Sequence, residues 1–111
     1  MKGLQGLISM TYDVSAVLLE EVKGYLQITW HDEDSRITRD IQRAMANLQT
    51  IVSPALTFTE EDDSRQLLLD CCRYIRNNSY EYFQPNFIEE IQSLQWKEAI
   101  KECANDAKSS P

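Results

Sequence analysis

Cysteine and histidine have the widest chemical repertoire of any side chains in this sequence, and both are few. The chain has three cysteines, Cys71, Cys72 and Cys103, and one histidine, His31. A thiol nucleophile needs a neighbouring base, and a zinc site needs about four thiolate or imidazole ligands at suitable spacing. Cys71 and Cys72 are adjacent, so their side chains leave a helix about 100° apart. We therefore expect reduced thiols, no metal and no cysteine catalysis, with His31 in a loop or at a helix cap.

Carboxylates are the next candidates for chemistry. Asp32, Glu33 and Asp34 follow one another, but they lack the glycine and the ligand periodicity of an EF-hand calcium loop. The sequence also contains no glycine loop that cradles phosphate, no dinucleotide fingerprint and no paired-histidine metal helix. We expect a protein that is not an enzyme and that binds no cofactor.

The charge balance argues against adhesive nucleic-acid binding. Eighteen acidic residues against eleven basic ones give a formal net charge of -7, which repels a phosphate backbone. The arginines are interleaved with acids, a pattern typical of solvated helix faces and of pairs between subunits. The arginines in question are Arg36, Arg39, Arg43, Arg65, Arg73 and Arg76.

Length and composition predict the fold class. A chain of 111 residues can bury one core without staples, and its three glycines and three prolines favour helices over turn-rich β folds. No stretch approaches the roughly 18 apolar residues that cross a bilayer, so we expect a soluble protein without membrane contact. We predict an all-α fold, a small bundle of about four helices with an extended loop between the second and third and a long C-terminal helix. Residues 14–107 form this helical domain, 1–13 a flexible extension and 108–111 a disordered tail.

Apolar spacing predicts the first two helices. The first covers Val17–Leu26, with Ser15 as its N-cap. The second runs from about Glu33 to Ile51 and ends before Pro54, because proline disfavours helical geometry in the preceding residue. The core positions predicted along the whole chain are Leu18, Val22, Leu26, Ile37, Ile41, Ala44, Leu48, Leu68, Cys72, Ile75, Phe87, Ile91 and Leu94.

The segment Ser53–Asp63 is the longest break in the pattern. Its first half holds Leu56 and Phe58, which we expect to be exposed, and its second half is a block of four acids. The acids can complement the start of a third helix or can face a partner or channel. We expect the loop to be mobile in the isolated subunit and ordered, or lumen-facing, only in an assembly. Its candidate channel or partner residues are Leu56, Phe58, Glu60, Glu61, Asp62 and Asp63.

Aromatic residues gather after the third helix, which Asp63 or Ser64 can cap. Tyr80, Tyr82, Phe83 and Phe87 bracket Pro85, which suits the first turn of the last helix. No basic groove surrounds these rings, so a core or interface role is favoured over base stacking.

The last helix has apolar residues on two opposite faces. Phe87, Ile91 and Leu94 share one face. A second apolar set, which begins at Trp96, lies about 180° away around the helix at 3.6 residues per turn. We infer that the first half packs on the monomer's core while the second half offers an assembly stripe to another chain. The alternative is a helix that curves round the bundle and buries both faces. The predicted stripe consists of Trp96, Ile100, Cys103 and Ala107.

Several stretches of the sequence share their order and spacing with a known family. They are Leu19-Glu20-Glu21-Val22-Lys23-Gly24-Tyr25-Leu26-Gln27-Ile28, then His31-Asp32-Glu33-Asp34-Ser35-Arg36-Ile37, and Leu67-Leu68-Leu69-Asp70-Cys71-Cys72-Arg73-Tyr74-Ile75-Arg76-Asn77-Asn78-Ser79 with Tyr82-Phe83, Asn86-Phe87 and Ile91-Gln92-Ser93-Leu94. In this order they resemble the head-tail connector family of tailed double-stranded DNA phages and prophages. The resemblance extends from about Val14 to Leu94 and depends on the order and spacing of helical segments, not on a catalytic signature.

This resemblance implies a subunit that joins a dodecameric ring beneath the portal protein, extends the DNA channel and receives a stopper or head-completion protein. Its place would be the virion neck, and the host cytoplasm during assembly. DNA would pass through without specific binding, and a negatively charged channel would let it slide. The nine-residue N-terminal extension departs from the family's pattern, and no catalytic residue is carried over.

A second interpretation is an acidic helical interaction module, such as an inhibitor that masks a basic surface. Such a protein would carry one continuous acidic face and would be monomeric or dimeric. Its size in solution would separate it from a ring-forming connector.

Overall fold

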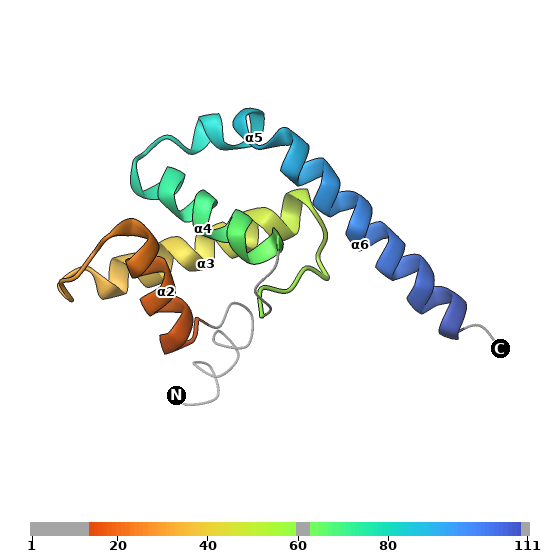
Figure 1. The fold of residues 1–111 in the computed structure, drawn as a ribbon, viewed down its shortest axis with the longest axis horizontal. Coiled ribbons are helices and arrows are strands. Elements are labelled where there is room, and N and C mark those ends of the chain that lie inside the picture. Colours follow the sequence, from red (N-terminus) through yellow and green to blue (C-terminus); the bar gives the residue numbers. More distant parts are fainter. Residues whose placement is uncertain (1–13, 60–62, 110–111) are drawn as a thin grey trace, which may run out of the picture.

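The structure is a computed structural model that describes residues 14–59 and 63–109, with side chains as far as residue 104. Within these residues the regular structure is entirely helical and contains no strand, which confirms the all-α class. Figure 1 shows the elements in order. They are α2 (Ala16–Leu26), α3 (Asp34–Ile51), α4 (Asp63–Arg76), the 3-10 turn η1 (Tyr80–Tyr82), α5 (Phe83–Asn86) and α6 (Ile88–Ser109).

The ends of α2 have clear local causes. Ser15 is its N-cap, as predicted, and the Ser15 side-chain oxygen accepts a hydrogen bond from the backbone N–H of Leu18 at 3.1 Å. At the other end Gln27 adopts a left-handed conformation with φ 61°. The N–H of Ile28 then donates to the carbonyl of Lys23 at 2.8 Å, which satisfies a carbonyl that the helix leaves free.

Helices α3 and α4 form the centre of the bundle. Glu33 lies next to the start of α3, and Arg76 at the end of α4 reaches it with two hydrogen bonds of 3.1 and 3.2 Å, so the helices run antiparallel. The hydrogen bonds from Arg76 and Trp30 lower the pKa of the Glu33 carboxyl. The largest fully buried side chains are Phe83, Ile37, Ile41, Leu48, Leu68, Val22, Cys71 and Cys72, most of them from α3 and α4.

The aromatic cluster packs at the turn between α4 and α6. Phe83 is 0 % exposed, and its ring lies 5.1 Å from that of Phe87 and 5.8 Å from that of Tyr74, centroid to centroid. The core interpretation of these aromatics is therefore confirmed for Phe83. Pro85 lies in the short helix α5, not in the last helix as predicted, because the chain bends at Phe87 before α6 begins.

The predicted exposure of Leu56 and Phe58 is wrong, because both side chains are buried in the core. They alternate with the exposed Thr57 and Thr59, so this part of the chain is extended, with every second side chain pointing inward. The amide of Gln49 donates to the Leu56 carbonyl at 3.0 Å and so ties the segment to α3. This half of the loop is a packed part of the monomer, while Glu60, Glu61 and Asp62 lie outside the described residues.

Most of the predicted core is buried, with Leu26, Ile75 and Phe87 only partly so. The predicted extension 1–13 lies outside the described residues. Within the predicted tail 108–111, Lys108 and Ser109 continue α6. The buried apolar residues that spacing did not place in the core are Ile28, Met45, Leu56, Phe58, Leu67, Leu69, Cys71 and Phe83.

A buried lysine joins α2 to the start of α3. Lys23 is 2 % exposed, and its ammonium lies 2.7 Å from Asp34 Oδ1 and 3.0 Å from His31 Nδ1. The hydrogen bond from Lys23 is the main cause that lowers the pKa of the Asp34 carboxyl. His31 thus lies in the connection between the two helices, as predicted.

We predict that Ile41→Ala lowers the free energy of unfolding by about 2–5 kcal/mol, because it removes a fully buried side chain between α3 and α4. Denaturant titration followed by circular dichroism measures the change. Val17→Ala, on an exposed face of α2, is the matched control and should change stability by less than about 0.5 kcal/mol. Equal stability of the two variants would contradict the described core.

A second prediction concerns the Lys23–Asp34 pair. Asp34→Asn should destabilise the fold more than Lys23→Met, because the first leaves a buried ammonium without its counter-ion and the second removes the charge. Asp34 has a lowered folded-state pKa, so its contribution is present above its ordinary pKa of 3.8 and is lost as pH falls through the folded value. Thermal unfolding across that range should show a weaker pH dependence in Lys23→Met than in the wild type. An unchanged profile would contradict the pairing.

Candidate assembly surface on helix α6

The first half of α6 is held on the bundle by one face. Ile91 and Leu94 are buried, and Phe87 just before the helix is partly buried against the core. Polar contacts also attach the next turn of α6 to the bundle. The Gln95 amide donates to the carbonyl of Ile51 at the end of α3 at 2.6 Å, and Lys97 forms an ion pair with Asp63 at the start of α4.

Glu98 continues the buried face of α6 although it is charged. It is one turn beyond Leu94, and only 6 % of it is exposed. The Lys101 ammonium lies 3.0 Å from its Oε2, which offsets part of the cost of burying the carboxylate. Burial of Glu98 was not predicted from the sequence, although its register with Ile91 and Leu94 was the available signal.

The opposite face of α6 is unpartnered within the described structure. Trp96 is 70 % exposed and Ile100 is 52 % exposed, and Cys103 is exposed as well. The structure therefore places these three predicted residues on the outer side of the helix, away from Ile91 and Leu94. Ala107 lies within α6, but its side chain is beyond the described ones. The alternative of a helix that buries both faces is wrong for the described side chains. We call Trp96, Ile100 and Cys103 the α6 stripe.

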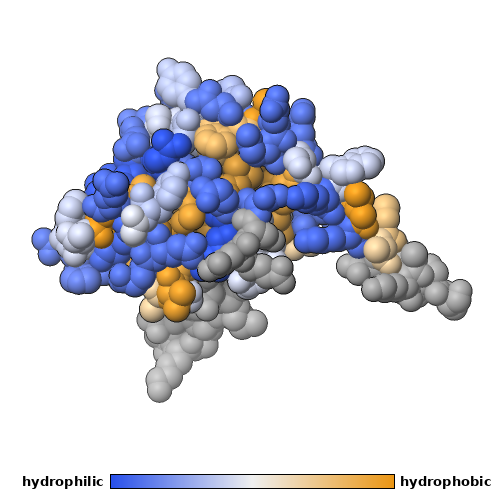
Figure 2. All heavy atoms as spheres, in the orientation of Figure 1, coloured by the Kyte–Doolittle hydropathy of each residue, from blue (hydrophilic) through white to orange (hydrophobic). Residues whose placement is uncertain are grey.

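The distal part of α6 projects from the bundle. Figure 1 shows the helix running outward past α3 and α4, and Figure 2 shows apolar atoms at the surface on this arm. The radius of gyration is 15.4 Å, against about 13 Å for a compact domain of 100 residues. Trp96 lies on the outer face of α6 where the helix is still attached to the bundle, and Ile100 and Cys103 continue that face toward the projecting end.

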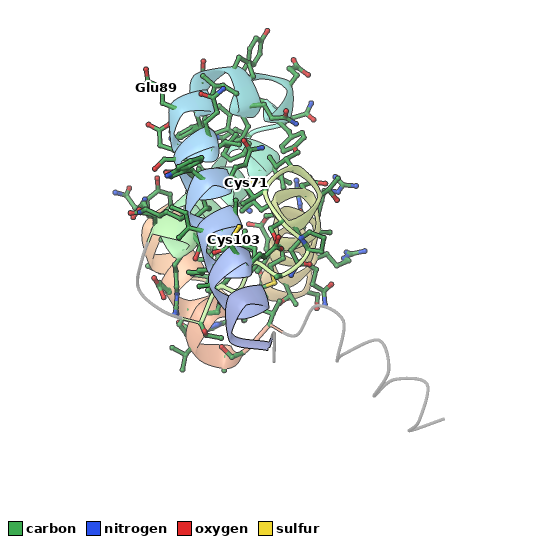
Figure 3. All side chains as sticks on the ribbon, turned by 90° about the vertical axis from the view of Figure 1, so that its right-hand side faces the viewer. Cys71, Glu89 and Cys103 are labelled. Carbon is green, nitrogen blue, oxygen red and sulfur yellow. The ribbon has the colours of Figure 1, made fainter. Side chains whose placement is uncertain are left out.

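The three cysteines occupy two different environments. Figure 3 shows Cys71 among the helices and Cys103 on the distal half of α6. Burial raises the pKa of the Cys71 thiol to about 12 and that of Cys72 further above its ordinary value, so both remain protonated core side chains. No group of three or more histidine, cysteine, aspartate or glutamate side chains in the described ranges could hold a metal ion.

The predicted loop site does not form one surface. Leu56 and Phe58 belong to the core, whereas Asp63 is exposed at the start of α4 and pairs with Lys97. Between them, residues 60–62 are not described. Of the two predicted candidate regions, the α6 stripe is thus the one whose described apolar side chains are available to a partner.

None of the helices described is both long enough and apolar enough to cross a membrane. Comparisons with protein-family models, with curated proteins and with solved structures found no match to this chain.

Thiol labelling tests the placement of the cysteines. In the native protein we expect an aromatic disulfide reagent to react rapidly with one thiol per chain, that of Cys103, and with all three thiols after unfolding. Burial keeps the reagent away from Cys71 and Cys72 and keeps their thiols protonated, and the thiolate is the reactive form. Cys103→Ser should abolish the rapid phase. A rapid phase that persists in this variant would contradict the burial of Cys71 and Cys72.

Proposed function

We propose that the protein is a structural head-to-tail connector subunit, an adaptor that acts by assembly and not by catalysis. In this proposal the subunits form a ring, with twelve copies implied by the family resemblance, under the portal protein. The ring extends the DNA channel in the virion neck and receives the stopper or head-completion protein. The observation that carries the proposal is the α6 stripe on an arm that projects from a packed monomer.

The stripe has the chemistry of a helix that docks into a groove. Trp96, Ile100 and Cys103 follow one another at spacings of four and three residues, so they form one apolar ridge. Exposed apolar surface of this kind is stabilised when another protein covers it. Tryptophan is also the residue type most often found to dominate interface energy, with losses of about 2 kcal/mol or more on truncation. We therefore assign the stripe to contact with the portal.

The charge of the chain suits a wall along which DNA moves. A net charge of -7 gives no general attraction for the phosphate backbone, so DNA would slide past a ring of such subunits without being held. This part of the proposal depends on the overall balance and not on a particular lining residue.

A second candidate function is an acidic interaction module that masks a basic surface. It is supported by a groove of about 320 Å³ between α4 and α6, whose lining includes the carboxylates of Asp63, Asp70, Glu89 and Glu90. A module of this kind would stay monomeric or dimeric. Sedimentation with and without portal-bearing capsids separates the two functions, since only the connector is expected to attach to capsids.

Trp96→Ala tests the connector proposal directly. We expect helical content and thermal unfolding to remain almost unchanged, because the side chain is exposed, while attachment to portal-bearing capsids falls at least tenfold. Electron microscopy of the mixture shows whether density is added below the portal. The matched control is Tyr82→Ala, which removes another exposed aromatic from η1 and should leave attachment intact.

Two outcomes would contradict the assignment of the stripe. A destabilised Trp96→Ala monomer with normal attachment would place the indole in the subunit's own core. Wild-type protein that never attaches to portal-bearing capsids would remove the connector proposal itself.

A further inference from the structure

One flank of α3 carries a row of three exposed arginines, two of which have no ion pair among the described residues. Arg36, Arg39 and Arg43 are all exposed, and at 100° per residue they lie within about 60° of one another, well away from the buried stripe. Arg36 is 3.7 Å from Glu33, but neither Arg39 nor Arg43 has a carboxylate of the described residues within 4.0 Å. We call these three residues the arginine face. Together with Asp40 they line a surface hollow of about 230 Å³.

Two arginines of α4 add positive charge near this face. Arg76 lies at the start of α3 through its contact with Glu33, and Arg73 is one turn earlier on α4. Asp40 is the acid set among these arginines, and burial raises the pKa of its carboxyl although the nearby guanidinium groups oppose the shift. Arg76 and Arg73 are themselves paired with Glu33 and Asp70, so Arg39 and Arg43 are the arginines of this region without an ion pair among the described residues.

The acidic groove between α4 and α6 carries charge opposite to that of the arginine face. Glu89 and Glu90 are exposed at the start of α6 and form no ion pair with a described residue. Figure 3 shows Glu89 pointing outward from this end of the helix. Asp63 and Asp70 line the other wall on α4, and Leu67 contributes an apolar portion.

The two surfaces lie at different places on the monomer. On α4, Asp63 and Asp70 are about 140–160° from Leu68, which packs toward α3, so the groove opens on the side away from α3. The groove lining on α4 extends from Asp63 to Asp70, whereas Arg76, which reaches the start of α3, lies at the C-terminal end of α4. One copy cannot join its own two surfaces, but successive copies can.

We propose that the arginine face of one copy docks in the acidic groove of the next copy. This inference rests on the proposed ring assembly and deepens it by naming the lateral contact. Guanidinium groups bind carboxylates through paired hydrogen bonds. Of the groove's carboxylates, Asp63 pairs with Lys97 and Asp70 with Arg73, so Glu89 and Glu90 are the ones left for the arginine face of another copy. A contact between two different surfaces of the same chain is head-to-tail, and it closes into a ring when the rotation between copies allows closure.

A second copy fits the arginine face better than nucleic acid does. A phosphate backbone would also meet Asp40, which lines the same hollow, and a molecule of net charge -7 around it. The groove of a second copy presents separate carboxylates at a limited site, which matches a short face of three arginines. The α6 stripe is left free for the portal.

Sedimentation velocity of the full chain tests the contact. The variants are Arg39→Gln with Arg43→Gln, which neutralises the arginine face, and Glu89→Gln with Glu90→Gln, which neutralises the groove. Over a concentration series we expect the wild type to form species larger than dimers, because a head-to-tail contact propagates. Each double variant should associate at least tenfold more weakly. Glu20→Gln with Glu81→Gln, at exposed positions outside both surfaces, changes the net charge as the groove variant does, and as its control should behave like the wild type.

An equimolar mixture of the two variants gives the most specific result. Each variant keeps one intact surface, so one arginine face and one groove can pair, and growth should stop at a dimer that contains one copy of each. A wild type that stays monomeric, association that neither variant weakens, or a mixture that grows beyond dimers would overturn the inference. So would an arginine face that binds duplex DNA in the absence of self-association.

Capsid attachment of the same proteins keeps this test separate from that of the proposed function. If the double variants associate as strongly as the wild type, and the wild type attaches normally to portal-bearing capsids, only the proposed lateral contact is overturned. Failure of the wild type to attach would instead count against the connector proposal, whatever the variants show in sedimentation.

Discussion

The antiparallel contact between α3 and α4 is the constraint on which the rest of the structure depends. Ile41 and Leu68 are fully buried at this contact, and each other element is positioned by covering one of its edges. On one side, Tyr25 of α2 donates a hydrogen bond to Asp70 of α4, and Arg65 of α4 donates one to Glu21 of α2. Lys23 of α2 forms an ion pair with Asp34 of α3. On the other, the aromatic cluster around Phe83 begins the return of the chain toward α6. Burial of apolar side chains has no preferred direction, so the charged contacts at the edges help to select one arrangement of the helices.

Helical periodicity was sufficient for the elements whose packing follows from their own residues. The ends of α2 and α3 agree with the predicted bounds because Ser15 caps one and Pro54 follows the other. The same periodicity placed the α6 stripe, since a short arc of one helix cannot face both the core and its opposite side. Local geometry therefore predicts which face of a helix remains uncovered.

Features that depend on distant segments could not be read in this way. Phe58 lies in an extended segment with no helical period, and only the presence of α3 and α4 beside it makes it a core residue. Glu98 occupies an apolar register, and its charge is tolerated because Lys101 lies beside it. The arginine face and the acidic groove likewise become separate surfaces only after α3, α4 and α6 are placed, because residues that appear mixed in sequence are sorted by the antiparallel pairing.

The different chemistry of the α6 stripe and the charged surfaces bears on how an assembly would form. Glu89 and Trp96 are seven residues apart on α6, about 10 Å along the axis, so the groove and the stripe follow one another on the same helix. In the proposed ring, lateral contacts near the start of α6 would align many projecting arms around one rim. Each stripe is small, so a single subunit would bind its partner weakly. Once linked in a ring, the stripes would bind at high effective concentration, and attachment would favour the completed assembly over free subunits.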